Sequence, residues 1–330
     1  MPRPSEDDLI ATYFAPLAGE GGLLLRDDAA VLRPSPGRDL ILTKDVLVAG
    51  VHFFSNDPPS AIARKALRVN LSDLAAKGAE PLGFLLGLAL PGDWTADWLA
   101  GFAHGLGEDA NLYACSLLGG DTVKTPGPLT ISITALGAVP TGKMAPRAGV
   151  EAGDQIYVTG TIGDAALGLK LRLGATSDQD WIGAASEAAA EFLLNRYLLP
   201  QPRLRLRTAL AYAHAAMDIS DGLAGDLAKM LRLTGMTAEV RLADVPLSKA
   251  AREVLRAAPR LIETICTGGD DYEILCAVPP ADSAAFMAAA EKDGLAVSLL
   301  GSAVHGESAP LFRDAGGGVV SFAKASFQHF

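Results

Sequence analysis

The hydrophobic pattern of the chain predicts helices and strands that alternate, as in a mixed α/β (α+β) protein. Apolar residues recur at helical spacing over residues 60–77 and 95–111, which predicts two helices. Apolar runs predict strands over residues 40–48 and 129–139, and the second run alternates clearly with polar residues. Because strands and helices follow one another closely, we expect the first half of the chain to form one compact α/β domain.

Shorter segments predict the remaining elements and a boundary between two domains. Further helices are expected over 5–18 with Ser5 as the cap, from 163 onward, and over 187–199, 221–233 and 283–293. Further strands are expected directly after Asp27-Asp28 and over 83–90, 114–118, 155–159, 216–219 and 272–278. Residues 141–153 are rich in glycine and proline and are expected to connect an N-terminal domain, 1–140, to a C-terminal α/β domain, 141–330.

Length and charge narrow the class of protein. The chain has 330 residues and 49% of them are apolar, enough for two domains with substantial cores. Its formal net charge of −10 argues against a general nucleic-acid or anionic-membrane surface, because such surfaces use basic patches. The longest apolar stretch, 82–90, contains glycine and is far shorter than the roughly 20 residues that span a bilayer. We therefore expect neither a nucleic acid nor a membrane as partner.

Cysteine usage and the first residues indicate a compartment. Cys115, Cys266 and Cys276 form no Cys-x-x-Cys pair, so the sequence indicates neither a disulfide framework nor a zinc site. A reducing compartment fits this usage best. Acidic residues at 6–8 stand where a signal peptide has a basic start. These features predict a cytoplasmic protein.

Aspartates at the edges of apolar runs are the feature that points to chemistry. Asp121 follows an apolar run and two glycines, which let a backbone approach a bound group closely. Asp73 instead projects from the helix predicted over 60–77. The other aspartates with this placement are Asp27, Asp28, Asp45, Asp218, Asp221, Asp270 and Asp271.

Each of these aspartates alone is explained at least as well by a turn, because turns favour Asp and Gly. Together they favour a cluster, since carboxylates at strand ends meet at one edge of a sheet. Several uncompensated carboxylates repel one another, so Mg²⁺ is the natural counter-ion. Such a cluster would bind nucleotide phosphates.

Several other residues keep two interpretations. His52 would either contact an anionic substrate or serve as a packing or solvent residue. Arg147 would either hold a phosphate or be solvated, and Ser220 would either bond a phosphate or cap the helix that follows it. Lys65 and Arg68 are expected to be surface or ion-pairing residues.

One nucleotide-binding motif is incomplete. Residues 137–144 match a P-loop except at the last position, where Met144 replaces the metal-binding hydroxyl. Pro146 is also badly placed for the long helix that a P-loop needs. An ordinary loop is the favoured interpretation.

A series of segments, taken in order, resembles the thiamine-monophosphate kinase family of the aminoimidazole ribonucleotide synthetase-like ATP-binding superfamily. No single segment is specific for this family, but the whole series is. The resemblance runs from roughly residue 6 to the end of the chain. The segments are DDAAVL at 27–32, DVLVAGVHF at 45–53, KALRVNLSDLAAKGA at 65–79, GGDT at 119–122, YVTG at 157–160, DISDGL at 218–223 and GGDDYE at 268–273.

The resemblance implies a two-domain aminoimidazole ribonucleotide synthetase-like fold and a homodimer whose N-terminal sheets join into a barrel across the subunit interface. It implies metal-binding roles for Asp28, Asp45, Asp73, Asp121, Asp218 and Asp221, with Thr43 and Lys44 at further metal-contact positions. It implies ATP contacts for Gly120, Asp121, Arg147 and Ser220, and thiamine monophosphate contacts for His52, Asp270 and Phe327.

This chain departs from the family at some of these positions. Lys44 stands where the family usually has threonine, and Asp270 replaces the usual glutamate, which is one methylene longer. Phe327 stands where another aromatic residue can occur. The departure at Lys44 affects metal binding, and the departures at Asp270 and Phe327 affect substrate binding.

The reaction implied by the resemblance is phosphoryl transfer from ATP to the phosphate of thiamine monophosphate, assisted by several Mg²⁺ ions, as the last step of thiamine diphosphate biosynthesis. No residue is assigned as acid, base or nucleophile, because a phosphate monoester is already a competent nucleophile. The rivals are another synthetase of the superfamily, although the reactive N-terminal Cys of a selenophosphate enzyme is missing, and a non-enzymatic nucleotide-binding protein.

Overall fold

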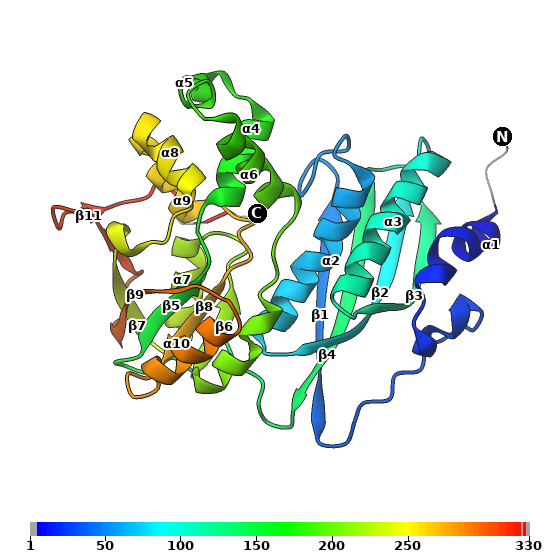
Figure 1. Cartoon of the computed structure of the whole chain (residues 1–330), viewed down its shortest axis with the longest axis horizontal. Helices are drawn as coiled ribbons and strands as arrows, with labels where there is room; N and C mark the ends of the chain where they lie inside the picture. Colours follow the sequence, from blue (N-terminus) through cyan, green and yellow to red (C-terminus); the bar gives the residue numbers. More distant parts are fainter. Residues whose placement is uncertain (1–4, 325, 328–330) are drawn as a thin grey trace. The chain divides into compact units, whose positions relative to one another are not determined.

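The computed structural model describes residues 5–324, 326 and 327, which form two compact units. The first unit consists of the described residues up to Leu74 and of Ala79–Lys143. The second consists of Ala75–Gly78 and of the described residues from Met144 onward. Figure 1 shows a mixed α/β arrangement in each unit.

An open four-stranded sheet forms the centre of the described part of the first unit. Its strands are β1 (Arg38–Val48), β2 (Glu80–Leu90), β3 (Ser116–Lys124) and β4 (Thr130–Pro140). They follow the order β1-β4-β2-β3, with β4 antiparallel to both of its neighbours and β2 parallel to β3. Strands β1 and β3 are therefore its edges, and one chain does not form the barrel that the resemblance implies.

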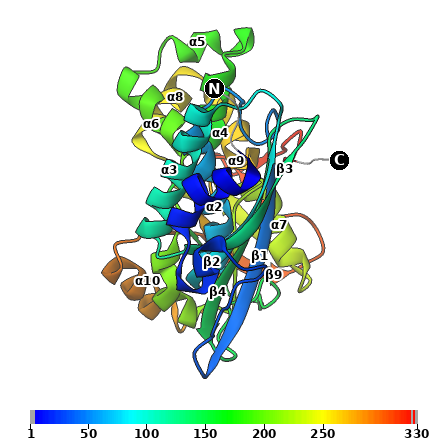
Figure 2. The ribbon, with the colours of Figure 1, turned by 90° about the vertical axis from the view of Figure 1, so that its right-hand side faces the viewer.

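Among the described residues, helices cover one face of this sheet and leave the other uncovered. Figure 2 shows α2 (Pro59–Ala76) and α3 (Ala96–Leu112) on the same side of the four strands. Because side chains of a strand alternate between faces, Ile131 and Ile133 are buried on the helix side. The opposite face of β1 exposes Leu40, Leu42 and Val46, and Leu85 of β2 is also exposed.

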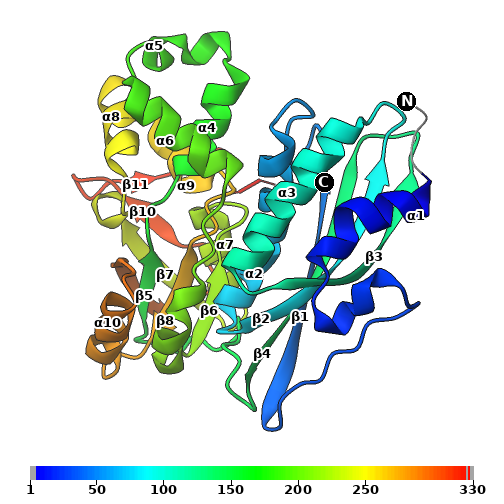
Figure 3. The ribbon, with the colours of Figure 1, turned by 45° about the vertical axis from the view of Figure 1, so that its right-hand side comes forward.

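The N-terminal segment begins as the helix that the sequence predicts. Helix α1 (Glu6–Leu9) continues as one π-helical segment, Ile10–Phe14, which contacts α3 (Figure 3). The Ser5 hydroxyl accepts a hydrogen bond from the backbone N–H of Asp8, which confirms the predicted cap.

The strand expected after Asp27-Asp28 is wrong, because residues 26–37 contain neither a strand nor a helix. The N–H of Val31 instead bonds to the carbonyl of Gly21, and the Val31 side chain is exposed. An apolar run alone does not make a strand when no partner strand lies alongside it.

A seven-stranded sheet forms the centre of the described part of the second unit, in the order β11-β10-β7-β9-β5-β8-β6. Its central strands are antiparallel, and β10 is parallel to β7. The strands are β5 (Gln155–Thr159), β6 (Ala215–Asp218), β7 (Met236–Arg241), β8 (Ile274–Val278), β9 (Val297–His305), β10 (Leu311–Arg313) and β11 (Val319–Val320).

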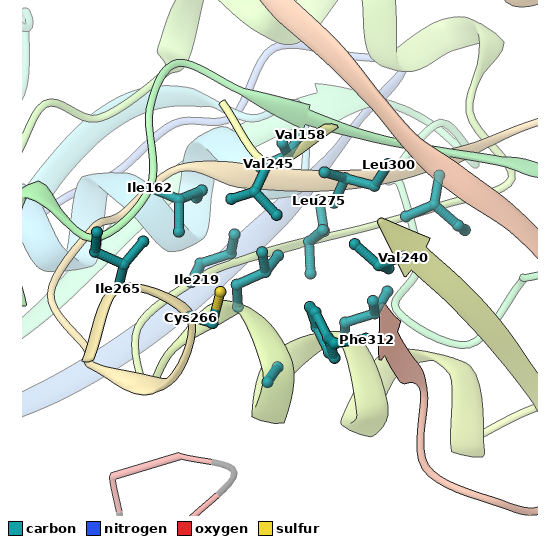
Figure 4. Packing of buried hydrophobic residues seen from close by; sticks show 14 of the residues in the cluster. Val158, Ile162, Ile219, Val240, Val245, Ile265, Cys266, Leu275, Leu300 and Phe312 are labelled. Carbon is teal, nitrogen blue, oxygen red and sulfur yellow. The ribbon is translucent and has the colours of Figure 1, made fainter. Parts of the chain in front are cut away.

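Helices bury both faces of this second sheet. On one face, Val158 of β5, Leu275 of β8 and Leu300 of β9 pack with Ile219 and Cys266 (Figure 4). On the other face, Tyr157 packs against Phe286, with ring centroids 5.1 Å apart. The helices of this unit are α4 (Asp164–Leu173), α5 (Gln179–Ile182), α6 (Glu187–Leu198), α7 (Leu223–Arg232), α8 (Lys249–Ala257), α9 (Ile262–Thr267) and α10 (Ser283–Lys292).

Most predicted elements are confirmed, with one difference that matters for the site. The strand expected over 114–118 begins at Ser116 and continues to Lys124, so Asp121 lies within a strand instead of after one. Strands β7, β9, β10 and β11 and helices α5, α8 and α9 were not predicted. In the part of the chain that the structure describes, no helix has the length and apolar character needed to cross a membrane.

Candidate nucleotide and metal site

A cavity of about 580 Å³ in the first unit brings together residues that the sequence places far apart. Asp27 and Asp28 line it from the segment before β1, and Gly119, Gly120 and Asp121 line it from β3. Its remaining lining is largely apolar. The cavity thus joins two predicted metal ligands, Asp28 and Asp121, to Gly120, which together with Asp121 is a predicted nucleotide contact.

Gly120 is required by the close approach of two strands. A Cβ at this position would lie 2.0 Å from the carbonyl oxygen of Leu86 on β2. The neighbouring Gly119 has room, since its nearest contact would be a Leu85 methyl group at 3.4 Å. The two glycines of this motif therefore have different structural roles.

We expect Gly120→Ala to lower the free energy of unfolding by roughly 2–3 kcal/mol, because the added methyl group meets backbone that a rotamer change cannot move. Gly119→Ala is the matched control and should change stability by less than about 0.5 kcal/mol. Urea unfolding of both variants measures the difference. Equal effects of the two substitutions would contradict the steric argument.

Two carboxylates, Asp45 of β1 and Asp73 of α2, form a second acidic group in the first unit. The Thr43 hydroxyl donates a hydrogen bond to Asp73, and the backbone N–H of Asp45 donates one to the Asn70 amide oxygen at 3.1 Å. Burial, together with the negative charge of Asp73, raises the pKa of Asp45 to about 7. Two neighbouring carboxylates are hard oxygen donors, and their shared negative charge fits a divalent cation such as Mg²⁺.

This raised pKa predicts a pH-dependent stability for the metal-free protein. The folded chain holds the Asp45 proton more tightly than the unfolded chain, so the free energy of unfolding falls as pH rises from about 4 to about 7. Asp45→Asn removes that loss and should stabilise the protein in EDTA by roughly 4 kcal/mol at pH 8, with little effect at pH 4. Thermal unfolding at both pH values tests this, and equal shifts would contradict it.

Lys44 lies on the opposite face of β1 from this acidic pair. Its ammonium donates a hydrogen bond to the Ser132 hydroxyl of β4. Successive residues of a strand point to opposite faces, so Thr43 and Asp45 face α2 while Lys44 does not. The Lys44 side chain is therefore not part of the Asp45 and Asp73 group.

The two acidic groups of the first unit lie on opposite edges of its sheet. Asp45 pairs with Ile133 of β4, Ile133 with Leu86 of β2, and Leu86 with Gly120 of β3. Three strand spacings of about 4.8 Å separate Asp45 from Gly120 and its neighbour Asp121 by roughly 14 Å. The expectation that these carboxylates meet at one sheet edge is therefore wrong within a single chain. Among the described residues, no three His, Cys, Asp or Glu side chains gather into a metal site.

The second unit brings its predicted residues together through backbone hydrogen bonds. Asp218 ends β6, and the loop after it contains Ser220 and Asp221. The N–H of Asp270 donates to the Ser220 carbonyl at 2.9 Å, and the N–H of Phe327 donates to the Asp221 carbonyl at 3.0 Å. Two predicted substrate residues thus lie against the 218–222 loop.

The segment around Asp270 has a strained backbone. Asp270 and Tyr272 both have positive φ, 74° and 51°, a region that costs energy for residues with a Cβ. Between them, the buried Asp271 carboxylate accepts a hydrogen bond from the backbone N–H of Gly163 at 2.7 Å. Burial raises the pKa of Asp271 well above its ordinary value. Strain of this kind persists only where the surroundings fix the backbone, and it positions Asp270.

Sequence reasoning missed Glu273, which is the buried anchor of the same segment. Its carboxylate accepts hydrogen bonds from Thr159 at 2.7 Å, from Arg196 at 3.0 Å and from the Nε of Arg203 at 2.6 Å. The side chain of Glu273 has no exposed surface. The available signal was a run of acids, GGDDYE, in a chain with arginines at 196 and 203.

Asp221 also has a partner that sequence reasoning missed. The Lys229 ammonium, on α7, donates to Asp221 at 2.5 Å and to Asp226 at 2.9 Å. Burial alone would lower the pKa of Lys229, but these hydrogen bonds raise it above its ordinary value. The spacing of Asp226 and Lys229, three residues apart on one helix, was the available signal.

The remaining candidates have local roles. His52, in the loop after β1, accepts a hydrogen bond at Nδ1 from the backbone N–H of Val48, and Lys65 donates to the His52 carbonyl. Arg68 is buried and pairs with Asp109, so its ion-pairing interpretation is confirmed and its surface interpretation is wrong. Arg147 is exposed.

Comparison with known proteins identifies the family of the chain. Residues 26–139 match the model described as "AIR synthase related protein, N-terminal domain", and residues 151–312 match the corresponding C-terminal domain. A thiamine-monophosphate kinase from Caulobacter vibrioides is 46% identical over 310 residues, which cover 92% of this chain and 85% of that protein.

Solved structures agree with this match. A thiamine-monophosphate kinase from Stenotrophomonas maltophilia K279a has a TM-score of 0.78 and 37% identity, covering 88% of this chain and 90% of the other. A structure described as AaThiL complexed with AMPPCP and TMP has a TM-score of 0.76 and 28% identity, covering 100% and 99%. The chain therefore belongs to the thiamine-monophosphate kinase family, within the AIR synthase related proteins.

Proposed function

We propose that this chain transfers the γ-phosphoryl group of ATP to the phosphate of thiamine monophosphate, giving thiamine diphosphate and ADP. Family membership supports the reaction, and a related structure contains AMPPCP and TMP. The observation within this chain that carries the proposal is the cavity where Asp28, Gly120 and Asp121 meet. Carboxylates beside a glycine-containing strand suit a metal-bound polyphosphate.

The proposed metal is Mg²⁺, held by carboxylate oxygens. We assign Asp28, Asp45, Asp73, Asp121 and Asp218 as ligands, with Thr43 beside them. When bound, Mg²⁺ neutralises the charge of the phosphates and of the transition state. Thr43 donates a hydrogen bond that orients the Asp73 carboxylate. Asn70 accepts a hydrogen bond that fixes the backbone of β1 at Asp45. Asp221 differs from these carboxylates because it is already paired with Lys229.

The remaining residues of the proposed site bind and orient. Arg147 and Ser220 are assigned to the nucleotide, and His52, Asp270 and Phe327 to thiamine monophosphate. Because His52 accepts a hydrogen bond at Nδ1, its neutral ring carries the proton on Nε2, which is the nitrogen we assign to the substrate phosphate. No general acid, base or nucleophile is assigned, because the acceptor is a phosphate monoester.

We also propose that the protein is a homodimer in which the N-terminal sheets of the two copies form a barrel. The uncovered face of the first sheet carries Leu40, Leu42, Val46 and Leu85, and the last of these is 40% exposed. A second copy would cover this apolar face and place an edge strand beside an edge strand. Pairing of β1 with β3 of the other copy would bring Asp45 of one chain towards Asp121 of the other.

The assay that tests the proposal combines purified protein, ATP, Mg²⁺ and thiamine monophosphate, with products separated by chromatography. We expect Mg²⁺-dependent formation of thiamine diphosphate and ADP in equal amounts. Free thiamine is the control acceptor and should remain unphosphorylated, because it lacks the nucleophilic phosphate. ATP turnover without thiamine diphosphate would point to another acceptor, and absence of both would favour a nucleotide-binding role.

A further inference from the structure

Asp221, Asp226 and Lys229 form a compact charged cluster at the start of α7. The Lys229 ammonium lies 2.5 Å from an Asp221 oxygen and 2.9 Å from an Asp226 oxygen. The second oxygen of Asp226 accepts hydrogen bonds from the backbone N–H groups of Asp221 and Gly222, at 2.9 and 3.1 Å. Asp226 is therefore held on both sides and fixes the ammonium next to Asp221.

The exposure of the three side chains distinguishes their roles. Asp226 is 1% exposed, whereas Lys229 and Asp221 are 36% and 34% exposed. A buried carboxylate needs a cation or donors, and here Lys229 and two backbone N–H groups supply them. The Lys229 ammonium thus contacts both the buried Asp226 carboxylate and the solvent-accessible Asp221 carboxylate.

The Lys229 ammonium occupies the position that a metal ion at Asp221 would need. A divalent cation bound to the Asp221 carboxylate would stand within a few ångströms of the Lys229 charge, and two cations on one carboxylate repel each other. Displacing Lys229 would leave the buried Asp226 without its cation. Both effects disfavour a metal at Asp221.

We propose that the Lys229 ammonium takes the place of a divalent cation at Asp221, so that Asp221 binds no metal of its own in this chain. The inference rests on the proposed function for the Mg²⁺ ligands elsewhere. Lys229 then acts as a positioning residue. It neutralises Asp221 at any metal concentration, and the Asp221 backbone carbonyl accepts the hydrogen bond from Phe327.

Counting bound Mn²⁺ by electron paramagnetic resonance on the full chain, without nucleotide, tests the inference. Lys229→Gln should bind one more ion per chain than the wild type, and Lys229→Gln combined with Asp221→Asn should lose that ion again. Lys229→Arg keeps the charge and is the matched control, with an unchanged count. Asp221→Asn alone should also leave the count unchanged.

Two outcomes would overturn the inference. One is a loss of one Mn²⁺ in Asp221→Asn, and the other is a folded Lys229→Gln protein that gains no ion. If circular dichroism shows that Lys229→Gln does not fold, the comparison of Asp221→Asn with the wild type decides. A wild-type chain that binds no Mn²⁺ would contradict the proposed ligand set instead, while a gained ion in Lys229→Gln would still support the role of Lys229.

Discussion

Asp121→Asn and Asp45→Asn are each expected to lower kcat by at least roughly 100-fold at saturating ATP and Mg²⁺, the size seen when one group that stabilises transition-state charge is removed. An amide is a poorer Mg²⁺ ligand than a carboxylate and leaves the phosphate charge less neutralised. Asp97→Asn, on the exposed first turn of α3, is the control and should keep full activity.

Mixing the two inactive variants tests whether the site is shared between copies. If Asp45 of one chain and Asp121 of another serve one site, a dimer of the two variants contains one site with both native carboxylates. Random exchange of subunits makes about half of the dimers mixed, so roughly a quarter of the wild-type activity should return. Unfolding and refolding the variants together achieves the exchange.

The mixture gives a different result if Asp45 and Asp121 act within the same chain. Where both carboxylates act within the same chain, every site in the mixture lacks one of them and no activity returns. The separation of roughly 14 Å across three strand spacings argues against that arrangement. A mixture as inactive as its components, in a sample shown to have exchanged subunits, would contradict the shared site.

The regular elements could be predicted wherever the local pattern decides them. The strand expected over 155–159 coincides with β5, and the helix expected over 60–77 differs from α2 by one residue at each end. Such segments have strong periodicity and clear ends. The apolar run after Asp28 failed because strand formation also needs a partner, and no strand lies beside it. The domain boundary after residue 140 stays a prediction.

The candidate site could be predicted residue by residue but not in its grouping. Strand order separates Asp45 from Asp121, and no local pattern reveals that β4 and β2 lie between them. Similarly, Lys229 reaches Asp221 across eight residues because the loop before α7 folds back onto that helix. Contacts of this kind depend on topology, which periodicity does not encode.

Removing a partner of the buried Glu273 carboxylate is expected to destabilise the protein strongly. Arg203→Ala removes two hydrogen bonds from a charge that has no exposed surface and leaves Arg196 and Thr159 as its partners among the contacts described above. Breaking a buried ion pair on one side typically costs about 3–5 kcal/mol of unfolding free energy. Arg205→Ala, an exposed position two residues away, is the matched control and should cost less than about 0.5 kcal/mol.

The same substitution should also affect substrate binding, because Glu273 ends the segment that holds Asp270. The carbonyl of Glu273 accepts a hydrogen bond from Ile219, and Asp270 bonds to Ser220, so the two segments support each other. Loosening the anchor releases the strained φ angles of Asp270 and Tyr272. Arg203→Ala should therefore raise the KM for thiamine monophosphate more than the KM for ATP, at a temperature where the variant is still folded. Equal changes in both constants would assign Arg203 a purely structural role, because Asp270 contacts thiamine monophosphate and not ATP in the proposed site.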